Sequence, residues 1–292
     1  MSVALAGDPY VYMVSPAGGG TMVTQLRASD RHAIATRRIG GHFELPAVPG
    51  ERTHEGLSHD GRTLVLTERP RNGTTRFALL ETIGLTPRRV VALRGVFSYD
   101  AMSPDGSTLY VIRYLSSDRT HYAVQAMDTS DANPALKTVV EKGEPGEQMS
   151  GLPISRTTSP NGGWVYTLYD GAGKTPFVHA LSTADRFTMC IDLDALAGRS
   201  DLASLNLKLS PNEPTLTVTG ANRKPLALIN TESFEVTEPP ATATTAPRKE
   251  PTAENGNTNT PKIIAIALAA GLVLAALAAM TRQARRSNAK HA

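Results

Sequence analysis

The sequence contains a single cysteine, Cys190, so neither an intramolecular disulfide nor a thiolate metal cluster can form. Cys190 lies in an apolar run and is expected to be a small buried side chain. A basic cluster is also absent from the first 238 residues. They hold 23 basic and 25 acidic residues, because seven of the 30 Lys and Arg but only two of the 27 Asp and Glu follow them. Without a basic surface for a phosphate backbone, the chain is not expected to bind nucleic acid.

Known catalytic and metal-binding motifs are absent too. No Gly-x-Ser-x-Gly nucleophile motif occurs. His54 and His59 are five residues apart, whereas the helix of a zinc protease needs four. The segment 171–175 imitates a phosphate loop, but leucine replaces the first glycine and the segment joins two expected strands. Three acidic residues lack the spacing of a calcium loop (Asp192, Asp194 and Asp201). The sequence therefore predicts no metal site and no cofactor.

One long apolar run is present near the C-terminus. Ile263 to Met280 is eighteen residues without charge, bordered by Lys262 and Arg282. As a helix it would span ~27 Å, enough for the core of a bilayer. The run predicts a single transmembrane helix, through which the chain partners the membrane. Small residues four apart on one face would permit a weak homodimer (Ala267, Gly271 and Ala275).

The charges around this run bear on topology. The tail 281–292 holds four basic and no acidic residues, which favours a cytoplasmic C-terminus and an extracytoplasmic domain. Export needs a signal peptide, yet the first residues show no basic or apolar region of that kind. Ala4-Leu5-Ala6 has the form of a cleavage site, so one hypothesis is that the sequence starts inside a longer signal peptide. The alternative is a tail anchor with the domain in the cytoplasm.

Residues 239–262 are rich in Pro, Thr, Ala and Asn and have no periodic apolar pattern. Such a segment is expected to be a disordered, extended stalk. The order of stalk, helix and basic tail resembles sortase substrates of Gram-positive bacteria. Their Leu-Pro-x-Thr-Gly motif is missing here, so the helix itself is expected to be the anchor.

A repeat defines the region before the stalk. Four segments read Ser-Pro-Asp-Gly or a variant of it, and each precedes a β-type run (57–61, 102–106, 158–162 and 209–213). Their serines are 45, 56 and 51 residues apart. Proline, Asp or Asn, and glycine are the residues of a tight turn, although the fourth copy has Glu213 at the glycine position. A second landmark recurs between further apolar runs (Asp30, Gly84, Asp131, Asp185 and Glu232).

Each repeat thus predicts four short strands in about 50 residues, the period of a β-propeller blade. These turn motifs resemble bacterial propeller repeats of the TolB and YVTN type, relatives of WD repeats, over residues 8–238. We expect an all-β domain, residues 1–238, forming a propeller of about five four-stranded blades. The first unit begins at Tyr10 and is expected to lack its own leading strand. Either truncation or ring closure by another segment would explain that.

In propellers, ligands usually bind at the channel mouth, which the residues leading each inner strand line. The positions three and four residues before the repeat serines are therefore the candidate ligand-binding residues. They are mostly polar (His54, Glu55, Tyr99, Asp100, Ser155, Arg156 and Asn206).

Taken together, these patterns predict a membrane-anchored propeller that acts as a binding or interaction module for a protein or small-molecule ligand. The resemblance to YVTN repeats, whose relatives include lactonases, implies an alternative: a membrane-tethered hydrolase with its site at the channel mouth. A scaffold that faces the cytoplasm is a third reading.

Overall fold

The computed structural model describes residues 1–47, 49, 54–131, 134–139, 149–212 and 214–239, which fall within one compact unit, Met1–Ala241. Within these residues no helix is long and apolar enough to cross a membrane. The predicted stalk, the transmembrane run 263–280, the basic tail and Glu213 lie outside the described residues. The fold described below is that of the first unit alone.

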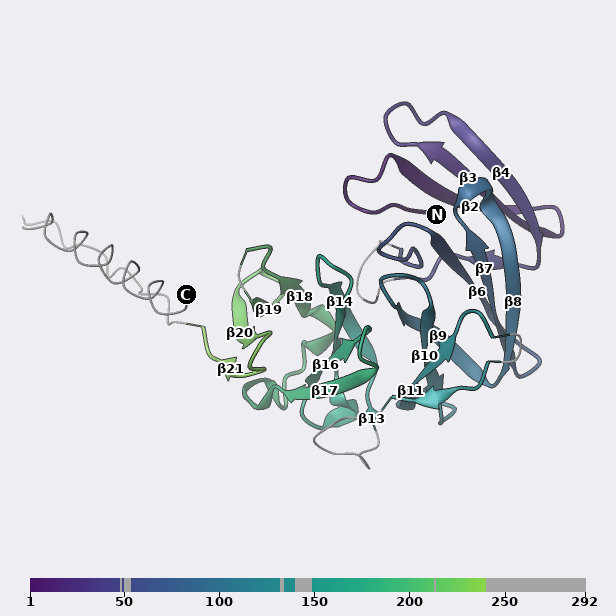
Figure 1. Cartoon of the computed structure of the whole chain (residues 1–292). Helices are drawn as coiled ribbons and strands as arrows, with labels where there is room; N and C mark the ends of the chain where they lie inside the picture. The colour runs from purple at the N-terminus through teal and green to yellow at the C-terminus, as the bar shows by residue number, and fades with distance from the viewer. Residues whose placement is uncertain (48, 50–53, 132–133, 140–148, 213, 240–292) are drawn as a thin grey trace, which may run out of the picture. The chain divides into compact units, whose positions relative to one another are not determined.

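The described residues form an all-β fold of five antiparallel sheets, and in each sheet the strands follow one another in chain order (Figure 1). The first sheet contains β1 (Ser2–Val3), β2 (Tyr10–Ala17), β3 (Gly20–Arg27) and β4 (Ala33–Gly40); the second contains β5 (Phe43–Glu44), β6 (Thr63–Arg71), β7 (Thr74–Glu81) and β8 (Thr86–Arg94). The third contains β9 (Val96–Met102), β10 (Thr108–Tyr114), β11 (His121–Asp128) and β12 (Lys137–Thr138), with β13 (Met149–Ser150) also paired to β11.

The fourth and fifth sheets complete the unit. The fourth contains β14 (Pro153–Thr158), β15 (Trp164–Tyr169), β16 (Phe177–Ser182) and β17 (Phe187–Asp192); the fifth contains β18 (Asn206–Leu209), β19 (Thr215–Thr219), β20 (Pro225–Asn230) and β21 (Val236–Thr237). Four short 3-10 turns lie in the connections, η1 (Ile83–Leu85), η2 (Gly171–Gly173), η3 (Asp194–Leu196) and η4 (Leu202–Ser204).

Five sheets of at least four strands agree with the predicted propeller blades. One expectation was wrong, because the first sheet does have a leading strand. The two-residue strand β1 pairs with β2, with Val3 opposite Tyr12. A strand this short leaves almost no pattern in the sequence.

The repeated turn has one hydrogen-bond scheme in its first three copies. In the second sheet, the Ser58 hydroxyl donates to Asp60 at 2.6 Å and accepts from the backbone N–H of Thr63 at 2.9 Å. The same pair of bonds occurs around Ser103 and Ser159. The serine therefore joins the turn carboxylate or amide to the start of the next strand, which explains why the motif needs serine.

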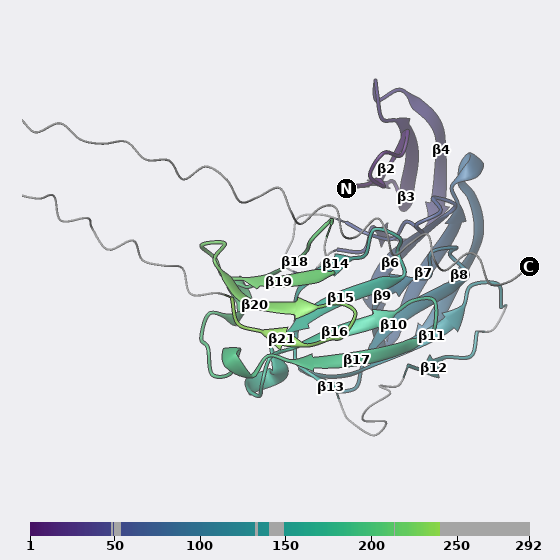
Figure 2. The ribbon, with the colours of Figure 1, turned by 60° about the vertical axis from the view of Figure 1, so that its left-hand side comes forward.

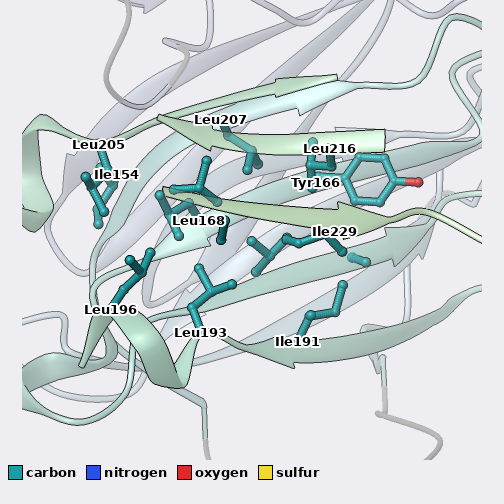
Figure 3. Packing of buried hydrophobic residues seen from close by; sticks show 14 residues of the cluster. Ile154, Tyr166, Leu168, Ile191, Leu193, Leu196, Leu205, Leu207, Leu216 and Ile229 are labelled. Atoms are coloured by element: carbon teal, nitrogen blue, oxygen red, sulfur yellow. The ribbon is translucent and has the colours of Figure 1, made fainter. Parts of the chain in front are cut away.

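Four hydrophobic clusters hold neighbouring sheets together, one for each consecutive pair. The cluster between the fourth and fifth sheets is shown in Figure 3, where Leu168 of β15 lies among Leu207, Leu216 and Ile229 of the fifth sheet. The innermost strands β14 and β18 lie side by side (Figure 2). Among the described residues, none of the four clusters joins the fifth sheet to the first.

The burial pattern of the second strand in each sheet shows which faces of that sheet are covered. In the three central sheets this strand is buried on both faces for at least four consecutive residues. In β19 burial alternates: Leu216 and Val218 face the fourth sheet, while the intervening threonines, Thr215, Thr217 and Thr219, are half-buried. Strand β2 also alternates around Met13, which is exposed. Each end sheet therefore has one covered face and one uncovered face.

Candidate functional site

The inner strands of three consecutive sheets bring the candidate residues together. Asp100 lies on β9 and Arg156 on β14, each just before a repeat turn. Glu55 precedes β6, and its segment is held to the second sheet by the bond from the Val65 N–H to the Gly56 carbonyl. All three occupy the same position, three residues before the serine of their repeat. Equivalent positions in equivalent sheets must converge on one axis, which is why the side chains meet.

The centre of the site is a buried arginine between two carboxylates. Arg156 Nη2 lies 2.7 Å from Asp100 Oδ1, and its Nη1 lies 3.1 Å from Glu55 Oε2. The side chains of Arg156 and Asp100 are 1% exposed, whereas that of Glu55 is 22% exposed. A third bond, from Arg156 Nε to the Thr167 hydroxyl, fixes the plane of the guanidinium. The arrangement is a charge-assisted network inside the fold.

The protonation of Arg156 is secured by its partners. Burial by itself would lower the pKa of the guanidinium, but the carboxylates of Glu55 and Asp100 outweigh burial and raise it. Arg156 therefore stays positive. One positive charge then stands against two negative charges, and the triad carries a formal charge of −1.

A cavity of about 180 Å³ adjoins this triad. Its polar lining includes His54, Glu55, Tyr99 and Asp100, and its apolar lining includes residues of the N-terminal segment, such as Val3. Oδ2 of Asp100, the oxygen not bound by Arg156, is buried and has no hydrogen-bond partner among the described residues. The cavity thus combines apolar walls with polar side chains, two of which belong to the triad.

Aromatic side chains surround the triad. Tyr99 is half-buried, and burial followed by the nearby charge of Glu55 raises the pKa of its phenol. The rings of Tyr122 and Tyr169 stack with their centroids 4.8 Å apart, and Tyr169 is near enough to feel the charges of Asp100 and Arg156. Burial likewise raises the pKa of both hydroxyls. These tyrosines are therefore neutral near pH 7 and add no charge to the site.

The structure groups five of the seven candidate residues and separates two. His54, Glu55, Tyr99 and Asp100 line the cavity, and Arg156 binds two of them. Ser155 is instead fully buried, and its hydroxyl accepts a hydrogen bond from the Leu207 N–H of the fifth sheet at 3.0 Å. Its role is to join two sheets. Asn206 is exposed and donates to the Ser204 carbonyl, at a different surface hollow.

Sequence reasoning missed two contributors to the cavity. His59 lines it and also approaches Gly162 of the fourth sheet. Its signal was present, because histidine replaces proline in this copy of the repeat. Val3, Ala4 and Leu5 line the cavity as well. Val3 lies in β1, and Ala4 and Leu5 come directly after it; the sequence pattern did not reveal this strand.

The segments that imitated other motifs adopt local structures of their own. The phosphate-loop mimic contains η2, which connects β15 to β16 as a hairpin tip, and Asp170 caps it by accepting from the Ala172 N–H at 3.0 Å. Within the described residues, no group of three His, Cys, Asp or Glu side chains is arranged to hold a metal ion. Cys190 is half-buried on β17 rather than fully buried as expected, since it lines a cavity of about 210 Å³ with Lys174 and Asp192.

No family model matches the chain, and no curated protein matches it. Solved structures do. Hydrazine synthase from Kuenenia stuttgartiensis is 13% identical, with a TM-score of 0.48, over 77% of this chain and 62% of its own. A protein described as TolB from Agrobacterium tumefaciens is 14% identical, with a TM-score of 0.41, over 79% and 76%. A protein described as a 6-phosphogluconolactonase from Bacteroides uniformis is 14% identical, with a TM-score of 0.45, over 80% and 68%.

This chain therefore spans 62% of the hydrazine synthase chain. At these identities and TM-scores the similarity carries no argument about activity. The class of protein is defined by the chain itself: an all-β repeat protein whose five antiparallel sheets agree with a β-propeller.

Proposed function

We propose that the chain is a membrane-anchored β-propeller that binds a ligand or partner at the cavity beside Arg156. One observation carries the proposal. Glu55, Asp100 and Arg156 occupy the same position in three successive repeats, and they form one charged network at the wall of a cavity. A buried network of this kind costs desolvation energy, which a purely structural role would avoid with apolar residues.

The anchoring half of the proposal rests on sequence. The apolar run Ile263 to Met280 is long enough to span a bilayer, and the basic tail after it favours a cytoplasmic C-terminus. The five sheets would then face the outside, joined to the membrane by residues 239–262. A second copy could associate weakly through the small residues of the helix.

Binding is better supported than hydrolysis. A lactonase-like hydrolase would need a general base or a metal-activated water at the cavity. Both carboxylates of the triad instead bind Arg156, so they are held for charge recognition rather than for proton transfer. Of the residues that line the cavity, His54 and His59 are the remaining candidates for the general base of a hydrolase.

Photocrosslinking in intact cells tests the binding proposal. A photoreactive phenylalanine analogue at His54, which lines the cavity, should give a defined adduct on irradiation. The same analogue at His121, exposed on the third sheet, serves as the matched control. A specific adduct at His54 alone supports binding at the cavity. Equal adducts at both positions, or none at either, would overturn it.

A further inference from the structure

The junction between the fourth and fifth sheets differs from the equivalent junction between the third and fourth. In the earlier junction, Arg186 of the turn before β17 donates at 2.7 Å to the hydroxyl of Thr108, which is buried at the start of β10. Trp164 and Phe234 hold the equivalent positions of the later junction. Trp164 follows its repeat serine by five residues, as Thr108 does, and the φ of Phe234 is 61°, against 58° for Arg186. An aromatic pair, with ring centroids 5.5 Å apart, thus replaces a polar one.

Trp164 also lines a groove of about 520 Å³ bounded by the repeat turns of the two sheets. Tyr166 lines the same groove, and the two rings are nearly parallel, with 8° between their planes and 6.1 Å between their centroids. In Figure 3 the hydroxyl of Tyr166 points away from the apolar cluster. Three prolines contribute further flat apolar surface (Pro160, Pro211 and Pro214).

The polar groups at one side of the groove are mainly donors. The indole N–H of half-buried Trp164 has no hydrogen bond among the described residues. Asn161 Oδ1 is already used within the turn, where it accepts from the Ser159 hydroxyl and the Gly163 N–H, so the amide nitrogen is left to donate. A sugar would also need acceptors for its many hydroxyl hydrogens. Proline residues offer carbonyl acceptors and no N–H, and extended proline-rich peptides dock in aromatic-lined grooves.

The charge of the groove adds a second requirement. Glu232 is exposed and is the one charged side chain among the described residues of the lining. Its carboxylate makes no ion pair with another residue in the part of the chain that the structure describes. An arginine or lysine of a peptide would complement this carboxylate, and an aromatic ring beside it attracts the same cation.

We propose that this groove binds a proline-rich peptide that carries an arginine or a lysine. The peptide would lie in the polyproline conformation against the rings of Trp164 and Tyr166, with a carbonyl group accepting from the indole N–H and the cation at Glu232. The groove shares no lining residue with the cavity beside Arg156, so the inference is independent of the function proposed above.

Trp164 is the only tryptophan in the sequence, so its fluorescence reports on the groove directly. The purified full-length chain in non-ionic detergent should be titrated with a blocked peptide of four prolines, one arginine and four prolines. The fluorescence should change with saturation. The same peptide with glutamate in place of arginine should bind about tenfold more weakly, and so should the arginine peptide with alanine in place of every proline, because it must lose more conformational freedom.

Glu232→Gln should weaken binding of the arginine peptide about fivefold. Glu235→Gln is the matched control, since Glu235 is exposed in the same turn but does not line the groove; its effect should be less than about twofold. Trp164→Thr introduces the residue that two other repeats have at this position, Thr63 and Thr108, and should weaken binding about thirtyfold by calorimetry. Glu232→Gln keeps the test valid if Trp164→Thr fails to fold, because Glu232 is exposed.

Three results would each overturn the inference. The first is that the arginine peptide gives no saturable change, or that the alanine peptide binds as tightly. The second is that Glu235→Gln loses as much affinity as Glu232→Gln. The third is that cellohexaose changes the fluorescence with saturation while the arginine peptide does not, which would make the groove a sugar site.

Discussion

The hydroxyl of Tyr110, in the third sheet, donates a hydrogen bond of 2.8 Å to the carbonyl oxygen of Thr183, in the fourth sheet. Tyr110 is completely buried, so this bond is shielded from water. It joins two sheets that an apolar cluster and the ion pair of Arg156 with Asp100 also hold together. The bond therefore adds a second directional constraint to this interface.

Replacing Tyr110 with phenylalanine should cost about 1 kcal/mol of unfolding free energy at pH 7, because one buried hydrogen bond is lost. The penalty should reverse at high pH. Burial raises the pKa of Tyr110 to about 12, against an unfolded value of about 10, so the tyrosine resists ionisation only in the folded state. Its contribution is complete below pH 10 and declines from there to pH 12.

Urea denaturation at pH 7, 9 and 11 measures this effect. The difference between wild type and Tyr110→Phe should shrink as the pH rises above 10. A difference that stays constant to pH 11 would mean that the hydroxyl is not buried as described.

Gly61 and Gly106 occupy the same turn position and have nearly equal φ angles, 70° and 72°, in the left-handed region. An alanine at either position is strained by about 1–2 kcal/mol. The two positions differ in the free space around the glycine. A Cβ on Gly61 would meet Asp8 Oδ2 no closer than 3.5 Å, whereas a Cβ on Gly106 would lie 2.5 Å from Thr63 Oγ1 and 2.8 Å from its Cβ.

Gly106→Ala should therefore destabilise the domain by about 2–4 kcal/mol and Gly61→Ala by about 1 kcal/mol. Thermal and urea unfolding of the two variants, side by side, decide the matter. Equal losses would show that the second and third sheets do not pack as closely as the structure indicates.

The strand β1 bears on the hypothesis that the chain is cleaved after Ala6. Val3 is 8% exposed and belongs to the cluster between the first two sheets, so removing residues 1–6 would remove part of a core. Deletion should cost about 2 kcal/mol or more and should open the cavity that Val3 and Leu5 line. Mass spectrometry of the N-terminal peptide of the mature protein should therefore find Ser2 and Val3 present.

Val236 provides the control, since it lies in an edge strand of the same length but is 40% exposed. Val3→Ala should destabilise the domain clearly, and Val236→Ala by less than about 0.5 kcal/mol. A mature protein that starts after Ala6 and still folds normally would contradict the assigned role of β1.

Protease added to intact cells tests the predicted topology. If the sheets face the outside, cleavage between residues 239 and 262 should release a fragment that contains all five sheets. A fragment covering residues 1–238 should fold alone, since Met1–Ala241 is compact by itself, and should serve as the size marker. A tag placed after Ala292 should stay protected until the membrane is opened. Protected sheets with a digested tag would establish the opposite orientation.

The sequence was informative where a residue type has one physical use. Glycine in a tight turn accepts a positive φ, and the first three copies of the repeat confirm the predicted turn at Gly61, Gly106 and Gly162. The positions of Glu55, Asp100 and Arg156 also followed from the repeat. Their pairing did not, because it depends on which charges three separate strands bring to one point.

The structure places two candidate residues away from the cavity beside Arg156 for a related reason. The Ser155 hydroxyl is used by the Leu207 N–H, a bond between sheets that no local pattern reports. Asn206 belongs to the last sheet and lines another hollow, together with Lys208 and Arg223. Conversely, the spacing between His54 and His59 excludes a zinc-protease pair but does not reveal that His59 lines the cavity. Contacts between repeats, more than the pattern within each repeat, determine which residues lie at the site.

The threonines of β19 make the fifth sheet different from the sheets before it, because they lie on its uncovered face. Where β10 and β15 turn Tyr110 and Tyr166 toward the next sheet, β19 presents Thr217. A copy of the fourth sheet inserted between β17 and β18 would meet matching apolar faces on both sides. The same copy attached after β21 would press its apolar face against hydroxyl groups. A duplication within the gene could therefore lengthen this domain from the inside but not after β21, and the copy with threonines would remain the last.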